Sequence, residues 1–134
     1  MASIFDGESI ICAGALIDEY FILTAAHCVT EFISGDDAYI AVNHTRSSDA
    51  YKNRILVDRL FENPDFCPTT GCLKINDVGL FKLAKPVLNI KPAKIINETL
   101  EINEFNLTVV GWGFTETFKS SDFGNLCHFY GSIC

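Results

Sequence analysis

The chain has 134 residues, enough for a single domain, and 49% of them are hydrophobic while 20% are charged. This balance favours a packed core and argues against a disordered chain. The formal net charge of −7 argues against nucleic-acid binding, because neutralising phosphates requires clustered Lys and Arg. No segment approaches the roughly 18 consecutive apolar residues of a membrane span, so no membrane partner is expected.

Short runs of strand-forming residues, separated by polar turns, follow one another along the chain. The predicted strands are residues 9–17, 20–23, 38–42, 54–61, 78–83 and 107–112. Helical periodicity is weak, and the exception is residues 24–28, where Ala25 and Ala26 favour one helical turn. Residues 124–134 have no obvious strand partner. The pattern predicts an all-β domain, and periodicity leaves both a barrel and a sandwich open.

The residues from Cys12 to Cys28 read CAGALIDEYFILTAAHC. They resemble the histidine-loop motif of the chymotrypsin- and trypsin-like serine proteases, where a C-G-G-S-L-I type strand leads to T-A-A-H-C. Outside such a motif, His27 would be interpreted as an ordinary histidine beside a structural cysteine. The resemblance implies that His27 is the general base and acid, and that a disulfide between Cys12 and Cys28 holds it within reach of its nucleophile.

Two later segments resemble the same family in the same order. Residues 76–83 read NDVGLFKL and resemble the family's N-D-I-A-L-x-x-L segment. The resemblance implies that Asp77 fixes the tautomer of His27 and stabilises its imidazolium. This mechanism is taken from the family, for which it is the standard description. Residues 109–113 read VVGWG and match the family's G-W-G, while residues 61–66 resemble its H-P-x-F/Y segment. The resemblance covers residues 4–118.

The resemblance implies the trypsin-like fold, in which two antiparallel six-stranded β-barrels hold the active site between them. We expect the first barrel only, with the second barrel missing, because the G-D-S-G-G string that carries the nucleophilic serine is absent from this chain. Ser120, Ser121 and Ser132 lack that context, so neither nucleophilic attack nor oxyanion stabilisation is supplied. Residues 1–118 are expected to be a partial protease domain, inactive as given. Residues 119–134 are an unmatched tail, which read-through of an intron from Gly124 would explain.

Six cysteines in a chain of this length indicate a disulfide framework and an oxidising compartment. Cys67 and Cys72 flank a short loop before Asp77, and they resemble the local bridges of arthropod clip-domain-type proteases. Cys127 and Cys134 either pair locally or are free thiols.

Three N-x-T sequons predict N-glycosylation in a secreted protein: Asn43, Asn97 and Asn106. The first eight residues, MASIFDGE, lack the basic region and the apolar stretch of a signal peptide. We therefore expect an extracellular protein whose signal peptide is missing from this chain, with Met1 an internal residue of the longer protein.

Cysteine and histidine side chains also ligate zinc, and two groupings compete for that role: Cys127 and His128 with Cys134, or Cys67 and Cys72 with His44. Neither grouping has the paired C-x-x-C and H-x-x-x-H spacing of zinc sites. We expect no metal and no cofactor.

The sequence therefore indicates a fragment of a secreted trypsin-like serine endopeptidase, whose partner in full length is a protein or peptide substrate. One alternative is a non-catalytic serine protease homologue that acts as a binding or regulatory module. A second is an unrelated, small, disulfide-rich secreted β protein. The isolated chain is expected to aggregate or to need a partner, because apolar inter-barrel surface and strand edges would face water.

Overall fold

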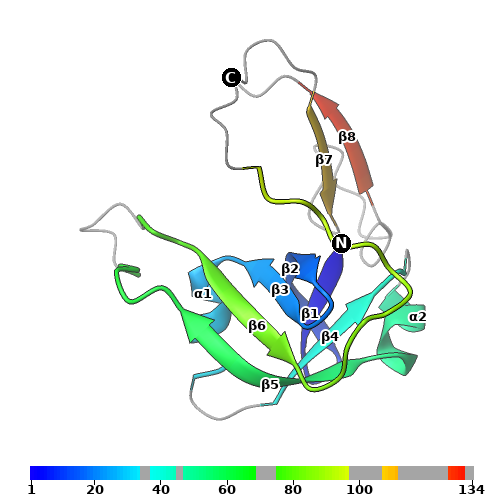
Figure 1. Ribbon diagram of the computed structural model, residues 1–134, viewed down its shortest axis with the longest axis horizontal. Coiled ribbons are helices and arrows are strands. Elements are labelled where there is room, and N and C mark those ends of the chain that lie inside the picture. The colour runs from blue at the N-terminus through cyan, green and yellow to red at the C-terminus, as the bar shows by residue number, and fades with distance from the viewer. Residues whose placement is uncertain (34–36, 45–46, 69–74, 97–106, 112–126, 132–134) are drawn as a thin grey trace.

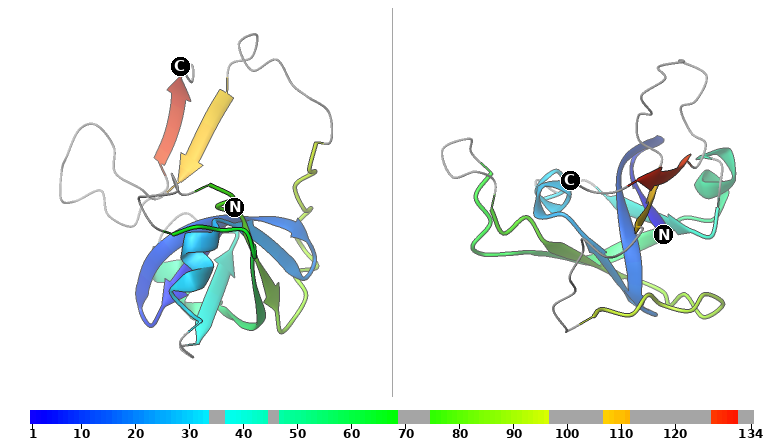
Figure 2. Two further views of the ribbon diagram at one scale, coloured as in Figure 1. Left: turned by 90° about the vertical axis from the view of Figure 1, so that its left-hand side faces the viewer. Right: turned by 90° about the horizontal axis from the view of Figure 1, so that it is seen from above.

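The computed structural model describes residues 1–33, 37–44, 47–68, 75–96, 107–111 and 127–131 (Figure 1). Its strands are β1 (Ala2–Asp6), β2 (Ser9–Asp18), β3 (Phe21–Thr24), β4 (Ala38–Val42), β5 (Ile55–Glu62), β6 (Gly79–Leu83), β7 (Leu107–Gly111) and β8 (Cys127–Gly131). Its helices are α1 (Ala26–Thr30) and α2 (Ser47–Lys52), which lie on opposite sides of the strands (Figures 1 and 2). No helix in the described ranges is long and apolar enough to cross a membrane.

Six antiparallel strands close into a barrel in the order β1-β2-β3-β6-β5-β4. The closure depends on two long-range pairings, of Ala2 opposite Val42 between β1 and β4, and of Phe21 opposite Lys82 between β3 and β6. This arrangement confirms the expected all-β fold with an antiparallel six-stranded barrel. It also resolves the choice between barrel and sandwich that periodicity left open.

The first barrel strand, β1, lies outside the strands that apolar runs predict, although the family resemblance implies that residues 1–4 are the middle of a strand. Its first four residues, Ala2 to Phe5, are all buried, so the strand has no alternation of inward and outward side chains to reveal it. Ser3 tolerates this burial because its hydroxyl oxygen lies 2.6 Å from Nε2 of His44, within hydrogen-bond distance. A fully buried strand with a polar residue in it is therefore invisible to a search for period-two patterns.

The barrel interior is filled by large aliphatic and aromatic side chains. The buried cluster includes Ile4, Leu16, Ile22, Ile40, Phe81 and Leu83 from the barrel strands. Phe32, from the segment after α1, packs edge-to-face on Phe81 with ring centroids 5.9 Å apart. Each such side chain contributes about 1.5–3 kcal/mol through removal of its apolar surface from water. The core therefore ties α1 to the strands that carry the rest of the site.

The predicted helical turn at residues 24–28 corresponds to α1, which begins at Ala26 and ends at Thr30. The second helix, α2, is a difference from the sequence expectation. It has only six residues, which is too short for helical periodicity to show. Its Ala50 packs with Phe5 and Ala41 in a small second cluster, so tertiary contact stabilises a helix that the local sequence does not indicate.

The expectation that residues 124–134 lack a strand partner is wrong for residues 127–131. These residues form β8, which pairs antiparallel with β7 in a separate two-stranded sheet, from Leu107 opposite Gly131 to Gly111 opposite Cys127. Pairing between segments this far apart in the sequence leaves no local turn signal to recognise. Trp112, at the end of the predicted strand, lies outside the described residues.

Residues 84–96 run along the barrel without regular secondary structure, and we call them the strap. Backbone hydrogen bonds fix it, from the Val87 amide to the Glu19 carbonyl at 2.9 Å and from the Ala93 amide to the Leu16 carbonyl at 2.7 Å. Val87 is buried in the core, yet Leu88, Ile95 and Ile96 remain 60–69% exposed. The strap thus carries part of the exposed apolar surface of the described chain.

Candidate active site

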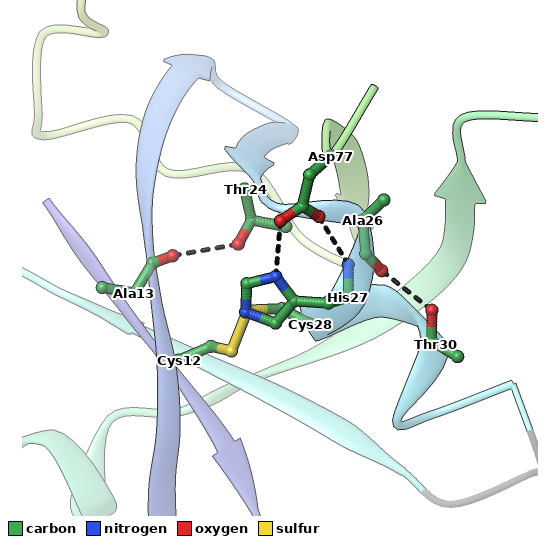
Figure 3. Close-up of a disulfide and its surroundings, with 8 residues drawn as sticks. All are labelled: Cys12, Ala13, Thr24, Ala26, His27, Cys28, Thr30 and Asp77. Carbon is green, nitrogen blue, oxygen red and sulfur yellow. Dashed lines mark hydrogen bonds and ion pairs between the residues drawn. A yellow bond between two sulfur atoms is a disulfide. The ribbon is translucent and has the colours of Figure 1, made fainter. Parts of the chain in front are cut away.

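A disulfide between Cys12 and Cys28 joins β2 to α1, with the two Cα atoms 6.2 Å apart. It is the bridge that the sequence resemblance implies, and it closes a loop across 16 positions (Figure 3). A loop of this length lowers the entropy of the unfolded chain by an amount worth about 3 kcal/mol at 25 °C. The bridge therefore anchors the helix that carries His27 directly to the barrel wall.

Strands β2 and β3 approach each other closely beside this bridge. A β-carbon at Gly14 would lie 2.6 Å from Cγ2 of Ile22 and 2.8 Å from the Leu23 carbonyl oxygen, so only glycine fits there. The Thr24 hydroxyl donates to the Ala13 carbonyl oxygen at 2.9 Å (Figure 3). The chain thus enters α1 from a strand that is fixed on both sides.

His27 and Asp77 are brought together from positions 50 residues apart. The Asp77 carboxylate accepts two hydrogen bonds from one residue: Oδ1 from the His27 backbone amide at 2.8 Å, and Oδ2 from the ring Nδ1 at 2.7 Å (Figure 3). The second bond requires the proton to lie on Nδ1, which leaves Nε2 as the ring nitrogen that can take up a proton. The His27 side chain is 58% exposed and that of Asp77 is 28% exposed.

The electrostatics of this pair favour an ionised carboxylate. The hydrogen bond from the His27 backbone amide, followed by that from the His27 side chain, lowers the pKa of Asp77 below its ordinary value of 3.8. A carboxylate that stays charged can stabilise a positive charge forming on the imidazole. The pair is therefore arranged to transfer a proton through Nε2 while Asp77 remains an anion.

Helix α1 packs directly against the strand that follows Asp77. A β-carbon at Gly79 would lie 2.5 Å from Cγ2 of Val29 and 3.2 Å from the Phe61 carbonyl oxygen. Glycine at this position lets α1 and β6 come together, and so brings His27 to Asp77. The Thr30 hydroxyl adds a second attachment, since the Ala26 carbonyl and a Glu62 carboxylate oxygen on β5 both lie within hydrogen-bond distance of it and can accept its single proton.

The other predicted site residues lie apart from this pair or outside the described ranges. Asn43 is exposed at the end of β4, with a left-handed φ of 57°. Cys67 is disulfide-bonded. The remaining predicted positions, Cys72, Asn97, Asn106 and Cys134, fall among the residues that the structure does not describe.

Metal ligation has little support where side chains are described. In that part of the chain, the grouping of potential ligands is Cys12, His27 and Cys28, whose ligand atoms lie within 4.8 Å of one another. Both sulfur atoms already form the disulfide, so they are not available as thiolates.

Sequence reasoning identified His27 and Asp77 but missed the groups that hold them. The bond from Thr30 on α1 to Glu62 on β5 joins residues 32 positions apart. Single polar residues in strands and short helices carry no pattern that would have indicated these partners.

The chain is similar in sequence to a protein family and to several curated proteins. A family model described as Trypsin matches residues 1–126. The chain is 32% identical over 110 residues to the venom peptide isomerase heavy chain of Agelenopsis aperta, which covers 77% of this chain and 43% of that protein. It is 36% identical over 109 residues to trypsin of Phaedon cochleariae, covering 78% of this chain and 41% of that protein. The chain therefore spans less than half the length of these curated relatives.

A solved structure of neuropsin, a serine protease of mouse brain, superposes on this chain with a TM-score of 0.74. The superposition covers 96% of this chain and 57% of that protein at 21% identity. At this identity the likeness concerns the fold alone, and it agrees with the closed barrel described above.

Proposed function

The chain belongs to the trypsin family, and from that premise we propose that it is the first barrel of a secreted serine endopeptidase. His27 is the general base and acid of peptide-bond hydrolysis, and Asp77 is the carboxylate that orients it. The observation that carries this proposal is the two-point contact of Asp77 with the backbone amide and the ring Nδ1 of His27. A carboxylate held in this way supports one imidazole tautomer and one ring orientation.

The proposed reaction uses a serine that this chain does not supply in a G-D-S-G-G context. We assign that serine to a second barrel outside this chain. Nε2 of His27 takes the serine hydroxyl proton as the oxygen bonds to the scissile carbonyl carbon. The imidazolium then gives this proton to the leaving amine when the C–N bond breaks, and water repeats the cycle on the acyl-enzyme. Asp77 stays ionised throughout, which its lowered pKa supports.

The family implies protein or peptide substrates, and the residues that select among them belong to the second barrel. On this proposal the chain by itself binds no substrate productively and hydrolyses no peptide bond. We also propose an extracellular location. Its support is the disulfide at the site, a bond that persists in oxidising compartments, together with the exposed sequon asparagine Asn43.

The proposal is tested with the longest product of the gene that contains this chain. We expect it to cleave denatured casein and fluorogenic peptides. His27→Ala is expected to lower kcat/KM by at least about 10⁴-fold, and Asp77→Asn by about 10⁴-fold. Both magnitudes are those of reference serine proteases rather than of this chain. Asp58→Asn, which changes an exposed carboxylate paired with Lys82, is the control and leaves kcat/KM within about twofold.

Hydrolysis that persists in His27→Ala contradicts the proposal. Genomic sequence gives an independent result, since an exon encoding G-D-S-G-G downstream of Phe123 supports the endopeptidase. An uninterrupted exon that ends in a stop codon after Cys134 supports instead the non-catalytic homologue, acting as a binding or regulatory module.

A further inference from the structure

Asp77 lies outside the strands, because β6 begins only at Gly79. Its carboxylate oxygens accept hydrogen bonds from the backbone amide and the ring Nδ1 of His27, at 2.8 and 2.7 Å, and the Ala26 backbone also contributes to lowering its pKa. A hydrogen bond weakens steeply when its distance or angle departs from the ideal, so a small shift of the Asp77 backbone disturbs both contacts at once. Something other than a strand ladder must hold this backbone in place.

The residue before it, Asn76, has a left-handed φ of 60°. Its carbonyl accepts a hydrogen bond from the Val78 amide at 2.8 Å, which closes a three-residue turn with Asp77 at its centre. Asparagine enters the left-handed region at far lower cost than most residues with a β-carbon. The turn that presents the carboxylate therefore depends on the backbone of Asn76.

The side chain of Asn76 gives this turn a second anchor. Its Nδ2 donates to the Asp65 carbonyl oxygen at 3.1 Å, across 11 positions of the chain. Asp65 belongs to a tight turn directly after β5, in which the Phe66 amide donates to the Asn63 carbonyl at 2.9 Å. The Asp65 amide also donates to Oδ1 of Asn63 at 3.0 Å.

The turn at residues 63–66, whose Asp65 carbonyl accepts the hydrogen bond from Asn76, is restrained by its own residues. Pro64 occupies its second position, where the fixed φ of proline suits a β-turn, and the asparagine at its first position caps it. The Asn76 amide thus joins the two ends of the connection between β5 and β6. It fixes them to each other whatever the course of the chain between them.

We propose that Asn76 is a positioning residue for Asp77, whose side-chain amide anchors the turn that presents the carboxylate to His27. The inference rests on the proposed function, in which that carboxylate orients the catalytic base. The side-chain amide sets the position of Asp77 against β5, and the left-handed backbone sets its direction toward α1. The hydrogen bonds of Asn76 go to Asp65 and Val78, so it acts on His27 through Asp77.

The test measures hydrogen exchange of the His27 backbone amide by NMR in the full chain. Asn76→Gly keeps the left-handed backbone and removes the amide, so His27 exchange should accelerate about two- to tenfold, as expected for loss of one neutral hydrogen bond. Asn76→Ala removes the amide and strains the backbone, and should accelerate it further. Amides of Ile22 and Phe81 in the barrel core report global opening and should change no more than in the control.

Asn43→Gly is the matched control, because Asn43 is also exposed and left-handed, with a φ of 57°, but lies at the end of β4. It reproduces the entropy that glycine adds to the unfolded chain and should leave the ratio of His27 to core exchange unchanged. If Asn76→Ala does not fold, Asn76→Gly still decides the matter.

The low-field NMR signal of the His27 Nδ1 proton is the second readout, and it should weaken or broaden in Asn76→Gly. Unchanged His27 exchange in that variant overturns the inference, as does acceleration spread uniformly over the barrel. Dependence of His27 protection on Asn76 supports the inference even when the longer protein cleaves no peptide. Peptidase activity with His27 protection that ignores Asn76 overturns it and leaves the proposed function standing.

Discussion

At the scale of the residue, the site depends on the contact of His27 with Asp77 and on the turn that presents the Asp77 carboxylate. His27 and Asp77 stand in strings long enough to resemble a family motif, and the structure brings them within 2.7 Å of each other. Asn76 is part of one of those strings, but its left-handed backbone and its bond to Asp65 are properties of three-dimensional contact. No single-sequence pattern distinguishes an asparagine that anchors a turn from one that faces water.

The lowered pKa of Asp77 predicts how the free energy of unfolding depends on pH. Because hydrogen bonds from His27 lower the pKa in the folded state, the carboxylate stabilises the fold above its unfolded pKa, near 3.8. That contribution is lost as pH falls through the lower folded pKa. We expect the free energy of unfolding of the chain to fall toward that of Asp77→Asn as pH is lowered from about 6 to about 2.5, as measured by urea denaturation.

Asp6→Asn is the control, since Asp6 is exposed at the end of β1. The difference in free energy of unfolding between Asp6→Asn and the unmodified chain should change little over the same pH range. The lowered pKa would be contradicted if the difference in free energy of unfolding between the unmodified chain and Asp77→Asn stays constant, or widens, as the pH is lowered.

At the scale of the element, packing between α1 and β6 determines which side chain fits at position 79, and the sequence alone does not reveal this contact. The family motif quoted for residues 76–83 has alanine where this chain has Gly79. Here Val29 of α1 fills the space that an alanine methyl would need, with 2.5 Å between its Cγ2 and the expected β-carbon. Five of the six barrel strands follow from short apolar runs, whereas β1 and α2 depend on burial that local patterns do not encode.

Gly79→Ala is therefore expected to overpack this contact and to lower the free energy of unfolding by about 1–3 kcal/mol. The double variant Val29→Ala, Gly79→Ala should be less destabilised than the sum of the two single variants, because the smaller side chain at position 29 removes the clash. A coupling of about 0.5–3 kcal/mol in a double-mutant cycle, measured by urea unfolding, is the expected result. Strict additivity would place the strain somewhere else.

At the scale of the whole molecule, the barrel could be predicted because its strands and motifs follow a family order. The residues that form its exposed apolar surface could not be predicted, because their exposure depends on the path of the strap along the barrel. Three exposed apolar residues on the strap, Leu88, Ile95 and Ile96, lie on a single short segment. Exposed apolar side chains of this size favour association in water.

We expect the isolated chain to self-associate in analytical ultracentrifugation at micromolar concentration. The triple variant Leu88→Ser, Ile95→Ser, Ile96→Ser should shift the distribution toward monomer. Ile33→Ser changes an apolar residue of comparable exposure, 57%, on the segment after α1, and should have a smaller effect. A monodisperse monomer of the unmodified chain at these concentrations would count against the strap as an association surface.

The long reach of the pairing between β3 and β6 has a consequence for synthesis of the protein. His27 and Asp77 are 50 residues apart, so at roughly 5–20 residues per second the ribosome takes roughly 3–10 seconds to pass from one to the other. Cys12 is made before that interval and Cys28 at its very start, and their bond needs only local chain closure. We therefore expect the oxidised loop to form on the nascent chain, with the acid–base pair assembling last, when β6 arrives to close the barrel wall.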